Sequence, residues 1–202
     1  MDLREAERPA RVVGIGASAG GVEALTRLVR RLPADFPAAV CVVLHVPSSG
    51  HSLLAPILDR ETELPVAQAH DGARLVRGHV YVAPNDRHLM VDVGRLRLDR
   101  GPKENGARPA VDPLLRSLAT AYGARAIAVI LSGALDDGSI GAVAVRRAGG
   151  TVIVQDPDDA IVPSMPQSAL RAVGRAAAVL AAADMGAALR TMVEASAVEA
   201  AL

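Results

Sequence analysis

The sequence predicts an α/β fold, doubly wound, with a mostly parallel sheet in a three-layer α/β/α arrangement and a β-hairpin in the middle of the chain. Short apolar segments alternate with segments of helical periodicity, which is typical of a parallel sheet covered by helices on both faces. The apolar segments lack polar alternation, as strands buried on both faces require. The 202 residues contain no internal repeat and no linker-like stretch, so we predict one domain. Its core is expected over about 12–180 and a terminal helix over about 185–201.

The first part of the chain predicts two strands separated by a helix. Residues 12–15 form the first strand, and Gly20 and Gly21 then open a helix that closes near Pro33. The apolar positions of this helix follow the helical period: Val22, Leu25, Leu28, Val29 and Leu32. The next expected elements are a wholly apolar strand over 39–44, a helix over 53–59 and a short strand over 65–67.

The middle of the chain departs from this alternation. A strand is predicted over 79–83 and is stopped by the turn residues that follow it. Residues 88–93 and 95–99 then alternate apolar and polar side chains on either side of Gly94. This alternation predicts a β-hairpin with one face toward water.

Parallel order is expected to resume after the hairpin. Asp112 is interpreted as the N-cap of a helix that has Pro113 in its first turn and ends at Gly123. The remaining predicted elements are a strand over 126–131, a helix over 138–148, a strand over 151–155, a helix from about 166, a strand near 177–180 and the last helix.

The composition excludes several classes of function. Half of the residues are hydrophobic, but only Phe36, Tyr81 and Tyr122 are aromatic, so the core should be aliphatic. The 22 basic residues balance the 22 acidic ones, which disfavours binding to nucleic acid or to an anionic membrane surface. No uninterrupted apolar stretch is long enough to cross a bilayer, so direct membrane insertion is not expected. The single cysteine, Cys41, lies in an apolar run and should be a buried thiol, and no metal site or cofactor is predicted. The charged N-terminus lacks a signal-peptide core, so we expect a soluble cytoplasmic protein.

A glycine-rich turn between the first strand and the first helix is the most informative segment. Residues 16–20 match G-x-S-x-G, the turn that projects a nucleophilic serine, here Ser18, where flanking side chains would clash. Two alternatives remain open on these residues alone. Ser18 could simply cap the helix. The glycines could also form a dinucleotide-binding turn, although Gly20 falls one place late and no acidic residue follows the second strand.

His45 follows the second apolar strand, where the dinucleotide motif would place an acid. The carboxyl ends of parallel strands meet at one edge of a sheet, and ligands bind there near a topological switch point. Ser18 and His45 both lie at such ends, which favours a nucleophile and its base over two unrelated polar residues. The other histidines begin strands or lie in loops and are weaker candidates for the base: His51, His70, His79 and His88.

Two adjacent aspartates follow the strand predicted over 126–131. A catalytic triad needs a carboxylate that orients the imidazole and stabilises its cationic form. Asp136 and Asp137 lie at the correct edge of the sheet for this role. We expect one of them to cap the helix that starts near Gly138 and the other to be available for chemistry.

Taken together, these segments resemble the catalytic domain of the chemotaxis receptor methylesterases, which are protein-glutamate methylesterases. Four further segments carry the resemblance: YVAPNDRH at 81–88, GPKEN at 101–105, RPAVD at 108–112 and SMP at 164–166. The similarity extends from about 12 to 180 and its motifs are ordered and correctly spaced.

The resemblance implies a serine hydrolase that removes methyl groups from glutamate methyl esters of chemoreceptors and releases methanol. Some members also deamidate receptor glutamines. The family's nucleophile falls on Ser18, its general base on His45 and its orienting acid on Asp137, whereas Asp136 is left a turn or capping role. The implied partner is the cytoplasmic domain of a methylated chemoreceptor, with a separate receiver domain as a candidate regulator.

The sequence departs from the family pattern at three points. Ala19 replaces the threonine that often follows the nucleophile, and Ala134 replaces a methionine in the loop before the acid. The chain also begins almost directly at the region of resemblance, without the receiver domain that many members carry. We therefore expect either part of a longer protein or an enzyme that acts without that switch.

Two other functions remain as alternatives. A non-catalytic signalling or docking module could share this fold, and the glycine-rich turn leaves room for a nicotinamide-dependent reductase. The serine, histidine and aspartate together favour the esterase.

Overall fold

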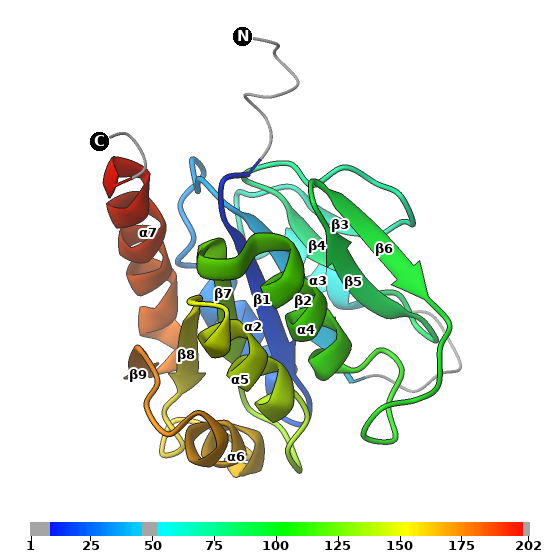
Figure 1. Cartoon of the computed structure of the whole chain (residues 1–202), viewed down its shortest axis with the longest axis vertical. Helices are drawn as coiled ribbons and strands as arrows, with labels where there is room; N and C mark the ends of the chain where they lie inside the picture. The colour runs from blue at the N-terminus through cyan, green and yellow to red at the C-terminus, as the bar shows by residue number, and fades with distance from the viewer. Residues whose placement is uncertain (1–8, 46–51, 200–202) are drawn as a thin grey trace, which may run out of the picture.

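Seven parallel strands form the central sheet of the computed structural model, which describes residues 9–45 and 52–199, with side chains as far as Glu194. The strand order is β3-β4-β2-β1-β7-β8-β9, and a separate antiparallel pair, β5-β6, forms the hairpin (Figure 1). The strand bounds are β1 Val12–Ala17, β2 Ala39–Leu44, β3 Val66–Gln68, β4 Val80–Val82, β5 His88–Asp92, β6 Arg95–Asp99, β7 Ala126–Ile130, β8 Thr151–Gln155 and β9 Ala178–Leu180. The predicted doubly wound, mostly parallel α/β fold is therefore confirmed.

Helices cover both faces of this sheet. The helix bounds are α2 Gly21–Val29, α3 Leu54–Asp59, α4 Val111–Tyr122, α5 Ser139–Arg147, α6 Ser164–Val173 and α7 Ala182–Glu199, with a short 3-10 turn, η1, at Gly123–Arg125. One core cluster joins the sheet to α4, α5, α6 and the hairpin, and the other joins it to α2, α3 and α7. In Figure 1, α4 and α5 cross in front of the sheet. None of the helices in the described ranges is long and apolar enough to pass through a membrane.

The elements follow the sequence-based expectations closely, with small shifts at their ends. Strand β1 continues to Ala17, and α7 begins at Ala182 rather than near 185. The hairpin turns at Gly94, whose φ of 78° suits a residue without a side chain. Val22 is an exception to the expected core pattern of α2, because it is 41 % exposed while Leu25 is fully buried. Val22 lies in the first turn of α2, at the edge of the sheet that carries the candidate site.

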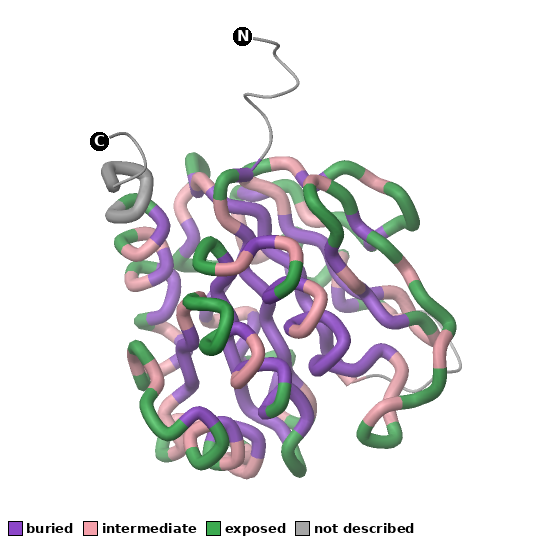
Figure 2. The backbone as a smooth tube through the Cα atoms, viewed as in Figure 1, coloured by how far each residue is buried: buried purple, intermediate pink, exposed green. Residues whose placement is uncertain are grey.

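The strands β1, β2 and β7 are buried along their whole lengths. Figure 2 shows buried backbone through the middle of the molecule, with the exposed segments mainly around its edge. Because both faces are covered, these strands are apolar at every position rather than at alternate ones. Cys41 is among them, as predicted, and burial raises the pKa of its thiol to about 12.

The order of the strands creates a switch point beside β1. From β1 the chain moves to β2 on one side, then to β3 at the edge of the sheet and to β4 between β3 and β2. It later returns to β7 on the other side of β1. Crossover connections diverge at such a point and leave a crevice outside the carboxyl ends of the strands. The residues that follow β1, β2 and β7 therefore share this edge of the sheet.

Two glycines of β1 let α4 approach the sheet closely. A Cβ atom at Gly14 would lie 2.9 Å from Cδ2 of Leu115, and one at Gly16 would lie 2.2 Å from Cγ1 of Val111. The second contact is with a stiff β-branched side chain at the start of α4, which has little freedom to move aside. Gly16 thus brings the first turn of α4 to the carboxyl end of β1.

This contact predicts that Gly16→Ala destabilises the fold by overpacking. We expect the free energy of unfolding to fall by about 1–3 kcal/mol, measured by urea denaturation with far-ultraviolet circular dichroism. The penalty should be smaller when Gly16→Ala is made in a Val111→Ala background, which removes both Cγ atoms from the contact. Equal penalties in the two backgrounds would contradict this account.

Candidate active site

Ser18 and His45 lie side by side because β1 and β2 are neighbours in register. Ala17 pairs with Leu44 at the carboxyl ends of these parallel strands, and the next residue of each chain segment is Ser18 or His45. The backbone N–H of His45 donates to the Ala17 carbonyl at 3.1 Å and continues the strand pairing to this point. The imidazole side chain is 20 % exposed, so one part of the ring reaches the surface and the rest is enclosed.

The turn after β1 holds Ser18 by its backbone and leaves its side chain unused. The Ser18 N–H donates to the Ser132 carbonyl at 2.9 Å, and the Ser18 carbonyl accepts from the Gly21 N–H at 2.8 Å. The N-cap of α2 is Gly20, with a φ of 74° and no side-chain cap. The structure therefore does not support the interpretation of Ser18 as a helix cap. Within the described ranges, the Ser18 hydroxyl makes no hydrogen bond, including none to His45.

Two glycines near Ser18 are packed so closely by their neighbours that neither has room for a side chain. A Cβ at Gly20 would lie 2.6 Å from the Ser132 hydroxyl and 2.7 Å from Cβ of Ile161. A Cβ at Gly133 would lie 2.9 Å from Cβ of Ser18 itself and 2.0 Å from Sδ of Met165. The loop after β7 therefore packs directly against the serine side chain at its Cβ.

Several backbone N–H groups near the serine have no acceptor among the described residues, including those of Ala19 and Ala134. Ala19 directly follows Ser18 and opens the turn into α2, and Ala134 follows Gly133, the residue that packs on Ser18. Unpaired N–H groups at a helix N-terminus favour negative charge. They are candidate donors to an oxyanion. Since these donors belong to the backbone, the alanines at both positions still supply them.

Asp137 is a buried carboxylate that receives four hydrogen bonds. Its side chain is 1 % exposed, and Oδ2 lies 2.6 Å from Nε2 of His45. Oδ2 also accepts from the Val111 N–H at 2.7 Å, while Oδ1 accepts from the Asp112 N–H at 3.0 Å and from Nδ2 of Asn105 at 2.8 Å. An ionised carboxylate only accepts, so Nε2 of His45 carries the proton and Nδ1 is the free ring nitrogen.

The hydrogen bonds to Asp137 stabilise its ionised form, which burial alone would disfavour. Burial is the largest influence and by itself would raise the pKa of this carboxyl. The bonds from His45, the backbone of Val111 and Asp112, and Asn105 together outweigh it, so the pKa lies below its ordinary value. Asp137 is therefore ionised at neutral pH, as a group that stabilises an imidazolium must be.

Each of the two helices nearest the site, α4 and α5, has its first N–H groups bound by an aspartate that belongs to the other helix or lies just before it. The sequence did not predict this arrangement. The N-caps of α4 and α5 are Ala110 and Gly138, and neither has a side-chain cap of its own. Asp137, just before α5, accepts from the first two N–H groups of α4. Asp112, within α4, accepts from the Gly141 N–H of α5 at 2.7 Å. The prediction that Asp112 caps its own helix is wrong, because Asp112 is the second residue of α4.

The adjacent aspartates are clearly distinguished. Asp137 is buried, whereas Asp136 is exposed and its side chain makes no hydrogen bond among the described residues. The Asp136 carbonyl accepts from the Ser139 N–H at 3.0 Å, so this residue forms the turn into α5. The expectation that one of the pair caps α5 is therefore wrong, and the turn role of Asp136 belongs to its backbone.

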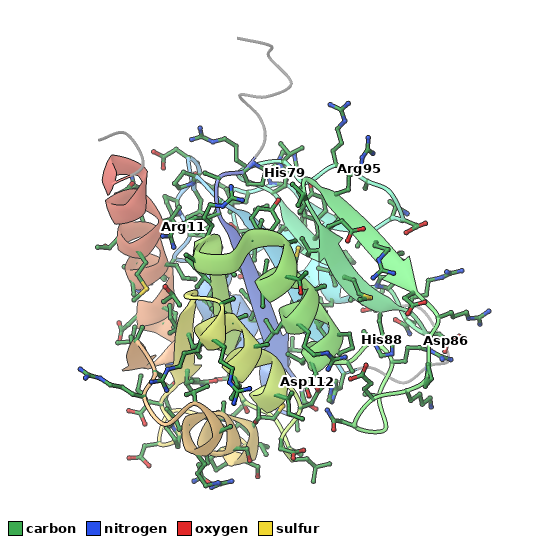
Figure 3. All side chains as sticks on the ribbon, viewed as in Figure 1. Arg11, His79, Asp86, His88, Arg95 and Asp112 are labelled. Carbon is green, nitrogen blue, oxygen red and sulfur yellow. The ribbon has the colours of Figure 1, made fainter. Side chains whose placement is uncertain are left out.

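The other described histidines have different surroundings. His88 is 2 % exposed and lies 2.8 Å from the Pro102 carbonyl through Nε2, while its Nδ1 accepts from the Ala110 N–H at 3.2 Å. His79 directly precedes β4 and stacks on Tyr81, near the opposite end of the molecule from Asp112 (Figure 3). His70 is exposed in a loop. The fourth alternative, His51, falls outside the described residues.

Comparisons with known proteins identify the family of the chain. A family model described as CheB methylesterase matches residues 13–189. The chain belongs to the CheB methylesterase family. The crystal structure of the Thermotoga maritima CheB methylesterase catalytic domain superposes with a TM-score of 0.85 at 40 % identity, covering 90 % of this chain and 98 % of that one.

Curated relatives in this family carry a double name, protein-glutamate methylesterase/protein-glutamine glutaminase. One from Rhodospirillum rubrum is 40 % identical over 195 residues, which cover 93 % of this chain and 50 % of that relative. Another, from Anaeromyxobacter dehalogenans, is 46 % identical over 173 residues, covering 85 % of this chain and 50 % of that relative. The chain thus spans about half the length of these relatives.

The described residues contain no group of three or more histidine, cysteine, aspartate or glutamate side chains that could hold a metal ion. At the site Asp137 is hydrogen-bonded to His45 and to Asn105, and this geometry suits acid–base and nucleophilic chemistry by side chains. One contributor to the site had no assigned role in the sequence analysis. Asn105 belongs to the segment 101–105 quoted for its resemblance, but nothing in its sequence neighbourhood indicates a contact with Asp137.

The four donors around Asp137 predict a pH-dependent loss of stability on substitution. Asp137→Asn replaces one accepting oxygen with an amide NH2 group that faces existing donors, and it should lower the free energy of unfolding at pH 7 by about 1–3 kcal/mol. Because the folded pKa is lowered, the ionised carboxyl stabilises the fold above its unfolded pKa of about 4, and this contribution is lost as pH falls through the folded value. Urea denaturation at neutral and acidic pH should therefore show the difference shrinking with acid. Asp136→Asn is the control and should stay near wild type at both.

Proposed function

We propose that the chain is a serine esterase that hydrolyses protein glutamate methyl esters and releases methanol, with Ser18, His45 and Asp137 as its catalytic triad. The observation that carries the proposal is the 2.6 Å contact between His45 and a buried, ionised Asp137, at the sheet edge where Ser18 projects an unused hydroxyl. Membership of the CheB methylesterase family supports the same reaction.

The position of the proton on the His45 imidazole determines which ring nitrogen can act as the base. Asp137 keeps the proton of His45 on Nε2, so Nδ1 takes the proton of the Ser18 hydroxyl as Oγ attacks the ester carbonyl. The N–H groups of Ala19 and Ala134 would hold the resulting oxyanion. His45 then returns the proton to the leaving methoxide, and methanol departs. Water, deprotonated by the same nitrogen, cleaves the acyl-enzyme and restores Ser18.

The same acyl-enzyme can form from a glutamine side chain, with ammonia as the leaving group in place of methanol. The double name of the curated relatives is consistent with both reactions. We extend the proposal to this second reaction because the donors and the nucleophile it requires are the same.

The proposed substrate is the cytoplasmic domain of a methylated chemoreceptor. This part of the proposal rests on the family, whose curated members are about twice as long as the chain. We propose that residues 1–202 act as one catalytic domain in the cytoplasm, and that a receiver domain, where present, regulates it.

Removal of the nucleophile should abolish the activity. We expect Ser18→Ala to lower methanol release from a methylated chemoreceptor fragment by at least about a thousandfold, since Ser18 supplies the attacking oxygen. Labelling by a fluorophosphonate probe should be lost in the same variant. A wild-type protein that neither labels nor releases methanol would instead support a non-catalytic docking module.

The adjacent aspartates provide a second test of the triad. Asp137→Asn should lower kcat by several orders of magnitude, because the wrong tautomer of His45 would be favoured. Asp136→Asn changes the same charge one residue away and should stay within about twofold of wild type. Methanol release at saturating receptor fragment measures both. The reverse ranking would exclude Asp137 as the orienting acid.

A further inference from the structure

Asn105 links two buried carboxylates, Asp137 of the candidate triad and Asp112 of α4. Its Nδ2 donates to Oδ1 of Asp137 at 2.8 Å and to Oδ2 of Asp112 at 3.2 Å. An amide nitrogen carries two protons, so one Asn105 side chain can satisfy both acceptors at once. Asp112 and Asp137 are each almost fully buried, at 3 % and 1 % exposed, which makes a lost donor costly at either one.

The bond from Asn105 bears on how Asp137 faces His45. Oδ1 of Asp137 is held by Asn105 and by the Asp112 N–H, and this leaves Oδ2 for Val111 and His45. Without Asn105, Oδ1 would keep only one donor, and the carboxylate could rotate or draw in water. Either change would move the oxygen that fixes the ring of His45.

The loop that carries Asn105 is fixed locally so that its amide points inward. Asn105 has a φ of 49°, in the left-handed region that asparagine tolerates better than most residues. On either side of it, Glu104 and Ala107 exchange backbone hydrogen bonds of 3.1 and 2.8 Å. The Glu104 carboxylate also accepts from Arg116 of α4 at 2.7 Å. The loop is thus closed on itself and attached to α4.

The two ends of the loop are anchored to the start of the hairpin. Arg108 donates to Oδ1 of Asp86 at 2.6 Å and to the Gly101 carbonyl at 2.7 Å. Hydrogen bonds from Arg100 and Arg108 lower the pKa of Asp86 to about 2, so this anchor stays charged at all working pH values. His88 contacts the Pro102 carbonyl at 2.8 Å. Figure 3 labels Asp86 and His88 together, to the side of Asp112 on which the hairpin lies.

We propose that Asn105 is a positioning residue for the triad, which orients the carboxylate of Asp137 toward His45 by cross-linking it to Asp112. This inference rests on the proposed function of Ser18, His45 and Asp137. The side-chain hydrogen bonds of Asn105 go to Asp137 and Asp112, so it acts through Asp137 rather than on the substrate.

The decisive variant is Asn105→Gly, with Lys103→Ala as its control. Glycine removes the amide and accepts the positive φ without strain, whereas Lys103 is an exposed residue of the same loop. We expect Asn105→Gly to lower kcat for methanol release roughly 10- to 100-fold with KM within about twofold, because a small displacement of an orienting group acts on the chemical step. Lys103→Ala should leave both constants unchanged. A kcat for Asn105→Gly within twofold of the control would overturn the proposal.

A second readout separates this inference from the choice of substrate. The second-order rate constant for fluorophosphonate labelling of Ser18 does not depend on a receptor, and it should fall in Asn105→Gly by a factor similar to that in kcat. If wild type labels but releases no methanol, the proposed substrate is wrong and the role of Asn105 is still measured. The downfield proton resonance of His45 Nε2–H, assigned by its loss in His45→Gln, should shift or broaden in Asn105→Gly. An unchanged resonance and labelling rate would mean that Asn105 only joins α4 to the loop before α5.

Asn105→Asp keeps the question answerable if the glycine variant does not fold. The new carboxyl would face Asp112 and Asp137, with Arg116 and Glu104 nearby, and its neighbours favour its neutral form. Once protonated, it can donate to Asp137 as the amide does. The activity of this variant relative to wild type should therefore rise as pH is lowered from about 8 to about 5. A ratio that stays flat over this range would contradict the proposal.

Discussion

The burial of one charged carboxylate organises the candidate site. Asp137 lies out of contact with water, and a carboxylate in that position is tolerated only if its oxygens are fully hydrogen-bonded. Its donors come from the start of α4, from the loop 101–110 and from His45 at the end of β2. Segments far apart in the chain must therefore meet at one point. The approach of α4 depends in turn on Gly16, which has no side chain to keep Val111 away from β1.

Much of this arrangement could be predicted from the sequence. Wholly apolar segments such as 39–44 indicate buried parallel strands without reference to any partner, and each predicted strand was found. The positions of Ser18 and His45 followed from the same logic, because residues at the carboxyl ends of parallel strands share one edge. That Ala17 pairs with Leu44, and so places the two side by side, needed the strand order as well.

The caps and the supporting contacts could not be predicted in the same way. Local rules assign an aspartate to the helix that begins beside it, yet Asp112 and Asp137 each serve the other's helix, 29 and 25–26 residues away. Asn105 is 32 residues from Asp137, and its exposed, polar loop gives no sign of a buried contact. Such pairings depend on how α4 and α5 dock, which is a property of the packed sheet and not of any short segment.

The exchanged caps have a consequence for how this fold can change over evolutionary time. Among the residues that the structure describes, Ser18 forms hydrogen bonds only through its backbone, so a lineage that abandons hydrolysis can replace its side chain without disturbing these contacts. Asp137 has no such freedom, since α4 loses its cap with it. A descendant that only binds its former substrate would thus keep the acid and discard the nucleophile. In this architecture the serine is the more informative mark of an active enzyme, and the aspartate alone is a mark of the scaffold.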